Sequence, residues 1–247
     1  MQQLHADFEV VAKVGRNFMY LREVAAAPII TQGKTTEFVN EYRDRTRTQR
    51  MIARCGNILP TDIKNEYSAA VACGVIGEVK HETIIKMRKV SKLVLADVQG
   101  MIRMAGKDKG VFHVPLHETG FRASTKYLDV LKVSAEEARY VDIEAVAKDC
   151  AVIVTQGMKG CTIYDGQQKT RIGTAPLREV DATGAGDSFL AGLAYGLVHG
   201  LELKRAAKLG NLLGGIAVGH LAIPRLSAEQ VRRARAMAAG GDIHERP

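Results

Sequence analysis

The segment between Asp181 and Asp187 is a glycine-rich turn flanked by two acids, with the sequence Asp-Ala-Thr-Gly-Ala-Gly-Asp. A short extended segment, Thr174 to Val180, precedes it, and an apolar run of helical character follows from Phe189 to Val198. A glycine-rich turn at a helix N-terminus directs free backbone N–H groups outward, and the positive end of the helix dipole lies at the same place. This pattern predicts an anion-binding site.

Asp187 is the candidate general base of this site, because a carboxylate there could take the proton of an attacking hydroxyl. The backbone N–H groups of Gly184, Ala185 and Gly186 would stabilise the charge that develops on a transferred phosphoryl group. A simpler reading stays open, in which small residues make a tight connection and the helix dipole favours an acid. No Gly-x-x-x-x-Gly-Lys-Ser/Thr sequence occurs, so the turn is not a P-loop.

Other polar residues follow predicted strands. Asp97 comes after one apolar strand, the residues from Lys132 to Ser134 stand at the end of a second, and those from Thr155 to Gly157 at the end of a third. Ligands of open parallel sheets bind at the carboxyl ends of the strands, so these positions and the glycine-rich turn are expected to share one site. Strand ends are also where turns place polar residues, and that alternative stays open.

The glycine-rich turn resembles the C-terminal signature of the ribokinase-like (PfkB) carbohydrate kinases. Two further segments agree in the same order: 131–138 is similar to the family's Asn-x-x-Glu segment, and 152–160 to its strand followed by Thr-x-Gly-x-x-Gly. Asn211 lies in a small-residue helix after the signature, as the family's adenine-side asparagine does. The resemblance covers nearly the whole chain and implies a three-layer α/β sandwich with a mostly parallel central sheet.

The same resemblance implies a nucleotide site and a metal site. Glu137 would hold Mg²⁺ through water. The residues implied to bind ATP are Ser134, Thr155, Gly157, Thr183, Gly184, Ala185, Gly186, Asp187 and Asn211. Structural alternatives stay open, because Ser134 and Glu137 also form a capping box, Thr155 and Gly157 suit a strand exit, and Asn211 suits a packed helix.

Within the family, the chain is most similar to the inositol kinase branch. The supporting segments are 95–103, 131–138 and 208–214. This likeness implies transfer of the γ-phosphate of ATP to a hydroxyl of myo-inositol, with Asp97 and Arg103 facing the substrate or the phosphates. Two alternatives stay open: a kinase for another sugar or a nucleoside, and a truncated, non-catalytic remnant that binds nucleotide.

The chain departs from the family pattern in two places. Ser134 stands where the family has the asparagine of its Asn-x-x-Glu segment. The chain also begins late relative to the family, whose members carry a strand, a substrate-binding aspartate and a Gly-Gly segment upstream. The two Gly-Gly pairs here, at 214–215 and 240–241, lie elsewhere. We therefore expect the first strand of the sheet to be missing and acceptor binding to be weakened.

Composition sets the remaining limits. A chain of 247 residues with 46% hydrophobic residues predicts one α/β domain over 1–239, with a frayed tail over 240–247. The four cysteines form no Cys-x-x-Cys pair, so we expect reduced thiols and no zinc site. The net charge of +8 suits an anionic nucleotide, whereas no aromatic residues interleave with the arginines as nucleic-acid binding requires.

No apolar stretch reaches the roughly 18 residues of a membrane span. The N-terminus carries Asp7 and Glu9 where a signal peptide would be apolar, so we expect a cytosolic protein. The sequence carries no signal of oligomeric state.

Strand-like and helix-like segments alternate along the chain, as an α/β fold requires. The predicted strands are 36–42, 47–55, 69–75, 93–96, 127–132, 151–155, 161–164 and 169–172, the last two forming a hairpin. The predicted helices are 4–14, 81–89, one beginning at Ser134, and 184–198, 203–221 and 228–239.

Overall fold

A six-stranded sheet forms the centre of the computed structural model, which describes residues 1–22, 27–43, 46–174, 180–221 and 225–241. The strand order is β12 (Gln168–Ile172), β11 (Cys161–Asp165), β10 (Ala151–Thr155), β9 (Val130–Ser134), β6 (Ser91–Asp97) and β5 (Tyr67–Ala72). Strands β5, β6, β9 and β10 are parallel, and β11 and β12 continue the sheet as an antiparallel hairpin. The carboxyl ends of the four parallel strands therefore lie along one edge of the sheet.

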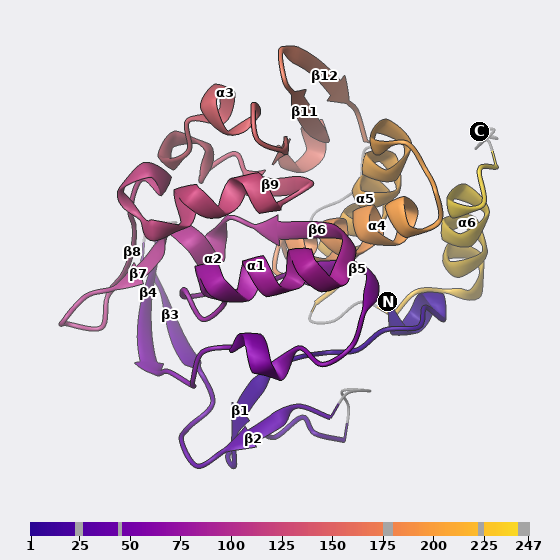
Figure 1. The fold of residues 1–247 in the computed structure, drawn as a ribbon. Coiled ribbons are helices and arrows are strands. Elements are labelled where there is room, and N and C mark those ends of the chain that lie inside the picture. Colours follow the sequence, from indigo (N-terminus) through magenta and orange to yellow (C-terminus); the bar gives the residue numbers. More distant parts are fainter. Residues whose placement is uncertain (23–26, 44–45, 175–179, 222–224, 242–247) are drawn as a thin grey trace.

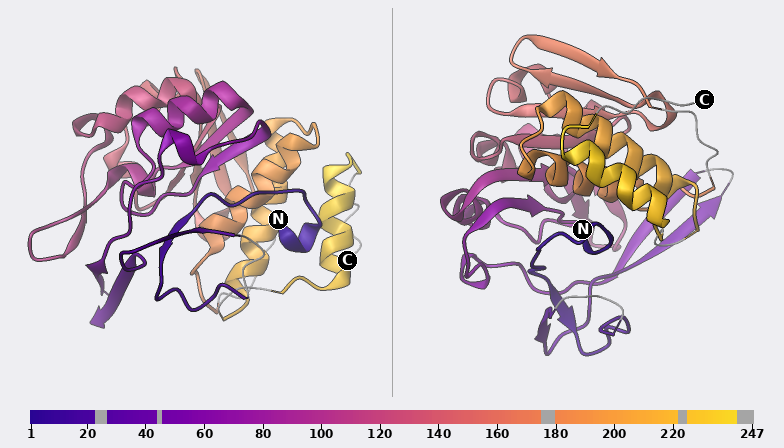
Figure 2. Two further views of the ribbon diagram at one scale, coloured as in Figure 1. Left: turned by 60° about the horizontal axis from the view of Figure 1, so that its bottom comes forward. Right: turned by 90° about the vertical axis from the view of Figure 1, so that its right-hand side faces the viewer.

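Helices cover both faces of this sheet and make three layers (Figure 1). One face carries α1 (His81–Val90), α2 (Gln99–Ile102) and α3 (Ile143–Val146). The other carries α4 (Ala185–Val198) and α5 (Leu203–Val218), with α6 (Ala228–Ala238) stacked against them, as the right-hand view of Figure 2 shows. The expected three-layer α/β sandwich with a mostly parallel sheet is confirmed.

Successive side chains along the central strands belong in turn to the hydrophobic cores on the two faces of the sheet. Val94 on β6 and Leu131 on β9 pack with α1, whereas their neighbours Leu95 and Val130 pack with α4 and α5. Successive side chains of a strand point to opposite faces, so a strand buried on both faces is a continuous apolar run. This explains why the sequence of these strands is apolar without a polar face.

Glycines allow α4 and α5 to pack closely. A Cβ at Gly192 would lie 3.0 Å from the Leu209 carbonyl oxygen, and one at Gly210 would lie 2.9 Å from both the ring and the carbonyl oxygen of Phe189. Cβ atoms do not normally approach other atoms so closely. The small residues therefore bring the two helices together, and this fixes the N-terminus of α4 against the sheet.

Three two-stranded pieces project from the sheet (Figures 1 and 2). They are β1 (Lys13–Gly15) with β2 (Ile29–Thr31), β3 (Glu37–Arg43) with β4 (Thr46–Ala53), and β7 (Arg103–Ala105) with β8 (Val111–His113). Short 3₁₀ segments connect the elements: Gln2–Leu4, Pro60–Asp62, Leu116–Glu118, Gly120–Tyr127, Ala138–Tyr140 and Gly157–Lys159. The β11–β12 hairpin confirms the pairing predicted from the sequence, and the strands predicted over 36–42 and 47–55 pair with each other as β3 and β4.

The helix predicted over 4–14 is wrong. Only Gln2–Leu4 forms a 3₁₀ turn, and the chain then runs extended into β1. The β-branched Val10, Val11 and Val14 favour extended backbone. The Glu9 carboxylate holds the segment in place, since it accepts hydrogen bonds from the Tyr67 hydroxyl (2.6 Å) and the Asn65 amide (2.9 Å).

Two other predictions around β9 need correction. The strand expected over 127–132 begins only at Val130, because residues 120–127 form a 3₁₀ helix. No α-helix begins at Ser134; the chain turns there and forms short helices at Ala138–Tyr140 and Ile143–Val146. The extended segment predicted over 174–180 and the tail predicted over 240–247 lie largely outside the described residues.

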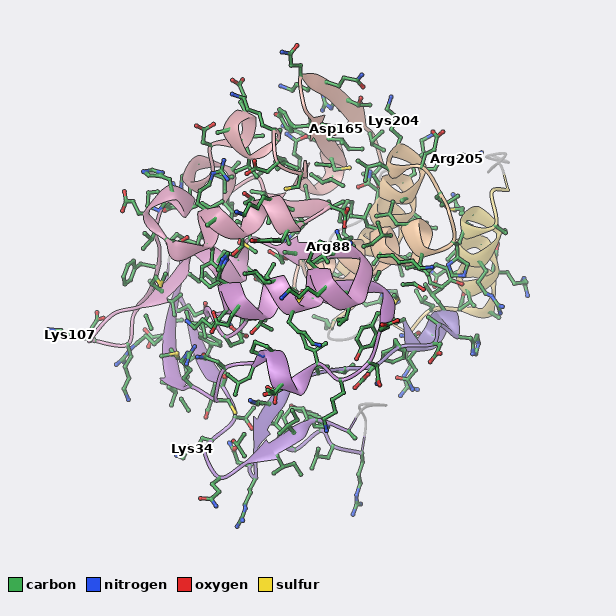
Figure 3. The ribbon with its side chains drawn as sticks, in the orientation of Figure 1. Lys34, Arg88, Lys107, Asp165, Lys204 and Arg205 are labelled. Atoms are coloured by element: carbon green, nitrogen blue, oxygen red, sulfur yellow. The ribbon has the colours of Figure 1, made fainter. Side chains whose placement is uncertain are left out.

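Charged side chains are spread over the outside of the molecule. Lys34, Lys107 and Lys204 project from widely separated parts of the surface (Figure 3). Within the described ranges, no helix is both long and apolar enough to cross a membrane.

Candidate active site

Two cavities meet at the N-terminus of α4. The larger, of about 1240 Å³, lies between the N-terminal segment, β5 and α4, and Asp187 and Cys73 line it. The smaller, of about 150 Å³, lies between the ends of α4 and α5 and the turn after β10, and Gly186 lines it. Since Gly186 and Asp187 are neighbours in the chain, the start of α4 separates the two spaces and faces both.

The glycine-rich turn begins the helix without a side-chain cap. Gly184 is the N-cap residue and has a φ of 77°, which favours glycine. Asp181 shapes the turn through its carboxylate, which accepts from the Thr183 amide at 2.9 Å. The Ala185 amide donates to the Ala182 carbonyl at 3.2 Å, so this predicted donor is already engaged.

The amides of Gly184, Gly186 and Asp187 have no acceptor among the residues that the structure describes. Two of them, Gly186 and Asp187, belong to the first turn of a fourteen-residue helix. Unpaired N–H groups at the positive end of a helix attract anions. The turn therefore offers the geometry that the sequence predicted, with Asp187 replacing Ala185 as a free donor.

The Asp187 side chain is exposed to the larger cavity, on the same wall as the Cys73 thiol. Although Cys73 is exposed on the cavity wall, desolvation by the surrounding atoms raises the pKa of its thiol to about 12, and the nearby carboxylates of Asp187 and Asp97 act in the same direction. The thiol is therefore protonated at neutral pH. The Asp187 carboxylate is one of the charges that favour the protonated thiol.

The smaller cavity brings together most of the residues predicted to contact a nucleotide. Its wall includes Thr155, Gly157, Ala185, Gly186 and Asn211, which come from β10, α4 and α5. The floor is shaped by glycines, a methionine and a phenylalanine, since Gly160, Gly214, Gly215, Met158 and Phe189 also line it. Small residues and apolar side chains therefore form most of the cavity wall.

Asn211 also has a structural role. Its side-chain amide donates to the carbonyl oxygens of Ile172 (3.3 Å) and Gly173 (3.1 Å), and only 8% of the residue is exposed. The amide thereby holds the end of β12 against α5. The packed-helix alternative is thus realised in part, while the residue still forms part of the cavity wall.

Ser134 and Glu137 make the reciprocal bonds of a capping box, although they close a turn and not a helix. The Ser134 amide donates to Glu137 Oε2 at 2.9 Å, and the Glu137 amide donates to Ser134 Oγ at 3.3 Å. The other carboxylate oxygen, Oε1, lies 3.7 Å from Arg103 Nη2. Glu137 is therefore buried, oriented by its own turn and paired with a cation.

This environment limits how Glu137 can hold a metal ion. No group of three or more His, Cys, Asp or Glu side chains forms a metal cage within the described part of the chain. Mg²⁺ keeps several waters and needs only one or two carboxylates when phosphates supply the other ligands. A single carboxylate fits a water-mediated contact to a phosphate-bound Mg²⁺, and it does not fit a permanently bound ion.

Asp97 does not face the open cavity as expected for a substrate ligand. It is 2% exposed, and both carboxylate oxygens are engaged: Oδ2 accepts from Lys132 Nζ at 2.8 Å and Oδ1 from the Gln99 amide at 3.0 Å. Arg103 is paired with Glu137 and lines neither cavity. The structure thus connects both residues to the strand ends and not directly to either cavity wall.

Lys132 is a site residue that the sequence indicated only by its place near a strand end, without assigning it a role. It lies on β9 between Leu131 and Val133, is 5% exposed, and its ammonium group approaches Gly186 so closely that a Cβ there would lie 2.8 Å from Nζ. A lysine inside an otherwise apolar central strand was the available signal, because lysines are almost never fully buried without a partner.

With this geometry in place, the chain can be compared with known proteins. The profile of the pfkB family carbohydrate kinases matches residues 89–223, more than half of the chain. The chain therefore belongs to the pfkB carbohydrate kinase family, as its glycine-rich turn indicated. The match includes β6, β9, β10 and α4, whose ends form the site.

Two plant kinases are similar to most of this chain. The chain is 38% identical to inositol 3-kinase of Zea mays over 230 residues, which are 89% of this chain and 61% of the relative. It is 37% identical to inositol 3-kinase of Arabidopsis thaliana over 237 residues, 92% of this chain and 67% of the relative. The chain thus spans about two thirds of the length of these relatives.

Solved structures agree on the fold. A pyrophosphate-dependent kinase of the ribokinase family, complexed with a pyrophosphate analog and myo-inositol, superposes with a TM-score of 0.76 at 20% identity, covering 93% of this chain and 86% of the other. Ribokinase of Thermotoga maritima superposes with a TM-score of 0.68 at 20% identity, covering 94% and 82%. These similarities establish the ribokinase-like fold.

Proposed function

We propose that this chain acts as an inositol kinase, which transfers the γ-phosphate of ATP to a hydroxyl of myo-inositol. The 37–38% identity to plant inositol 3-kinases supports the acceptor. A kinase with the same fold was solved with myo-inositol, which agrees with a polyol substrate. The four free cysteines suit the reducing cytosol, where we expect the protein to act.

One observation carries this proposal: the start of α4 is shared by two cavities. The small cavity, with its glycines and Asn211, suits the adenine end of a nucleotide, and the large cavity, with Asp187, suits the acceptor. A phosphoryl group that passes from one space to the other must pass the free amides of Gly186 and Asp187. A pure binding module would not need a carboxylate on the far side of that turn.

The transfer follows from these positions. Asp187 takes the proton of the acceptor hydroxyl as its oxygen attacks the γ-phosphorus. A new O–P bond forms, the bond between the γ-phosphorus and the bridging oxygen breaks, and ADP leaves with that oxygen and its electron pair. The free amides at the start of α4 stabilise the negative charge on the transferring group.

Mg²⁺ would neutralise charge on the donor phosphates when bound. Glu137 is the residue that would position it through water, because its carboxylate is fixed by the Ser134 amide and lies at a strand end. The Thr155 and Gly157 side of the smaller cavity would hold the nucleotide. These roles are part of the proposal and are tested with it.

The direct test is release of ADP from Mg-ATP in the presence of a panel of polyols, sugars and nucleosides, with Asp187→Asn as the inactive control. We expect myo-inositol to give the highest kcat/KM. A parallel assay with Mg-pyrophosphate in place of ATP identifies the phosphoryl donor, since a kinase of the same fold uses pyrophosphate.

Three outcomes would change the proposal. Preference for another sugar or a nucleoside would replace the acceptor and leave the mechanism intact. If only pyrophosphate supports phosphorylation, the donor would be pyrophosphate and not ATP. Binding of Mg-ATP without turnover of any acceptor would favour the alternative of a non-catalytic nucleotide-binding protein.

A further inference from the structure

Lys132 occupies an unusual position in the proposed site. The strand β9 is buried on both faces, and the side chain of Lys132 is 7% exposed. A buried ammonium group is costly unless it is paired. The partner is Asp97 on the neighbouring strand β6, which forms an ion pair with Lys132. The two residues are also directly opposite each other in the register of β6 and β9.

The ion pair uses only part of the hydrogen-bonding capacity of the lysine. An ammonium group has three N–H donors. The bond to Asp97 Oδ2 at 2.8 Å is the one hydrogen bond that Nζ makes to the described residues. Two donors are therefore available in a space from which water is largely excluded. Buried donors are normally satisfied, so this capacity points to a partner that binds there.

Glycine at position 186 allows these donors to approach the free end of α4 closely. A methyl group at position 186 would lie 2.8 Å from Nζ and 3.4 Å from Cε of Lys132. Because glycine has no side chain, nothing stands between the ammonium group and the Gly186 backbone. The lysine thus approaches the start of α4 from the side of the sheet, next to the amides of Gly186 and Asp187 that have no acceptor among the described residues.

The charges around Lys132 keep it protonated. Burial alone would lower the pKa of Lys132, but the carboxylates of Asp97, Glu137 and Asp187 together raise it above its usual value. The cation is therefore present at neutral pH. It lies within electrostatic reach of both Asp187, on the acceptor side, and Glu137, on the proposed metal side.

We propose that Lys132 is a catalytic residue that binds the transferring phosphoryl group with its free N–H donors, and that Asp97 positions it. This inference rests on the proposed function and deepens it. The ammonium group supplies a fixed positive charge on the sheet side of the phosphoryl group, opposite the acceptor. Asp97 is then a positioning residue and not a substrate ligand, because its two carboxylate oxygens accept hydrogen bonds from the Lys132 ammonium group and the Gln99 amide.

Calorimetry with three probes tests the proposal: adenosine, Mg-ADP and the Mg complex of a non-hydrolysable ATP analogue. Lys132→Gln should weaken binding of the analogue by about tenfold to a hundredfold, the range for one charge-assisted hydrogen bond. Adenosine affinity should change by less than about twofold, because the lysine does not contact the base. Lys204→Gln, a change on the outer surface, is the matched control.

Two further variants separate binding from folding. Asp97→Asn combined with Lys132→Gln removes both buried charges. The double variant should therefore melt at a higher temperature than Lys132→Gln alone, and its affinity for the analogue should stay as low. Gly186→Ala keeps both charges but places a methyl group against Nζ, and it should cause the same selective loss. In the kinase assay, kcat should fall in all of these variants while the KM for the acceptor stays within about twofold.

Parent-like affinity for the analogue and parent-like kcat in a folded double variant would overturn the proposal. So would failure of the parent to bind any phosphate-bearing probe. Equal loss of adenosine and analogue would indicate a merely structural lysine and would also overturn it. If the parent binds the analogue but phosphorylates no acceptor, the proposed function fails, while the binding comparison still decides the role of Lys132.

Discussion

Asp187 is the proposed general base. It lies in the first turn of α4 and is exposed to the larger cavity. Asp187→Asn keeps the size of the side chain but cannot accept a proton, so we expect kcat to fall by about 10²-fold or more. Mg-ATP affinity should change little. Steady-state kinetics and calorimetry measure both, and turnover within a factor of two of the parent would remove Asp187 from the mechanism.

The Cys73 thiol offers a readout of the same site without turnover. With a pKa of about 12, only about one thiol in a thousand is ionised at pH 9, so alkylation by iodoacetamide should be about a hundredfold or more slower than for a free cysteine. Because the charge of Asp187 helps to raise this pKa, Asp187→Asn should lower it and accelerate alkylation at pH 9.

Site-resolved mass spectrometry measures this rate over pH 8 to 11. The rate should keep rising through that range, since the thiolate is the reactive form and its fraction increases towards the raised pKa. A plateau near pH 9 would contradict the raised pKa of Cys73, and a rate in Asp187→Asn that matches the parent would contradict the influence of Asp187 on the thiol.

At the scale of elements, the packing of α4 against α5 fixes the site. A Cβ at position 210 would lie 2.9 Å from Phe189, next to the small cavity. Gly210→Ala should therefore lower the free energy of unfolding by about 1–2 kcal/mol, although alanine has the better helix propensity. That loss corresponds to a decrease in Tm of roughly 2–8 °C for a chain of this size.

A matched change on the same helix provides the control. A Cβ at Gly219, the C-cap of α5, would lie 3.5 Å from the Ile216 carbonyl oxygen, an ordinary contact, and φ there is −78°. Gly219→Ala should be neutral or slightly stabilising. Calorimetric melting of the two variants checks the prediction, and equal Tm values would show that α4 and α5 can separate without cost.

At the scale of the whole molecule, the nucleotide should stabilise the fold, because the cavity proposed to bind it is built from β10, α4 and α5 together. Mg-ATP at about 100 times its Kd should add about 2.7 kcal/mol to the free energy of unfolding. We expect a rise in Tm of roughly 5–10 °C, with the same rise in Asp187→Asn, which retains the nucleotide side.

Differential scanning calorimetry with Mg-ATP, Mg-pyrophosphate and Mg²⁺ alone measures this effect. Stabilisation by Mg²⁺ alone would contradict the inference that Glu137 does not hold a permanent metal ion. Stabilisation by pyrophosphate but not by ATP would contradict the assignment of the smaller cavity to a nucleotide.

The sequence by itself determined the features that depend on local pattern. The run Ala151–Thr155 and the hairpin around Asp165-Gly166 were predicted from apolar runs and turn residues, and the structure has strands at those places. The glycine-rich turn at the start of α4 was equally local, since glycine before an apolar helical run determines both its conformation and its exposed amides. The resemblance to the family rested on the same residues.

Only the tertiary structure decided which residues meet. The segment 4–14 has an apolar pattern compatible with a helix, but its contacts with Tyr67 and Asn65, about 56 residues away, hold it extended. Lys132 reads as an isolated charge in a strand, and its role appears only when β6 supplies Asp97 and α4 supplies Gly186. Burial, charge pairing and close backbone approach depend on neighbours distant in the chain, so local pattern cannot determine them.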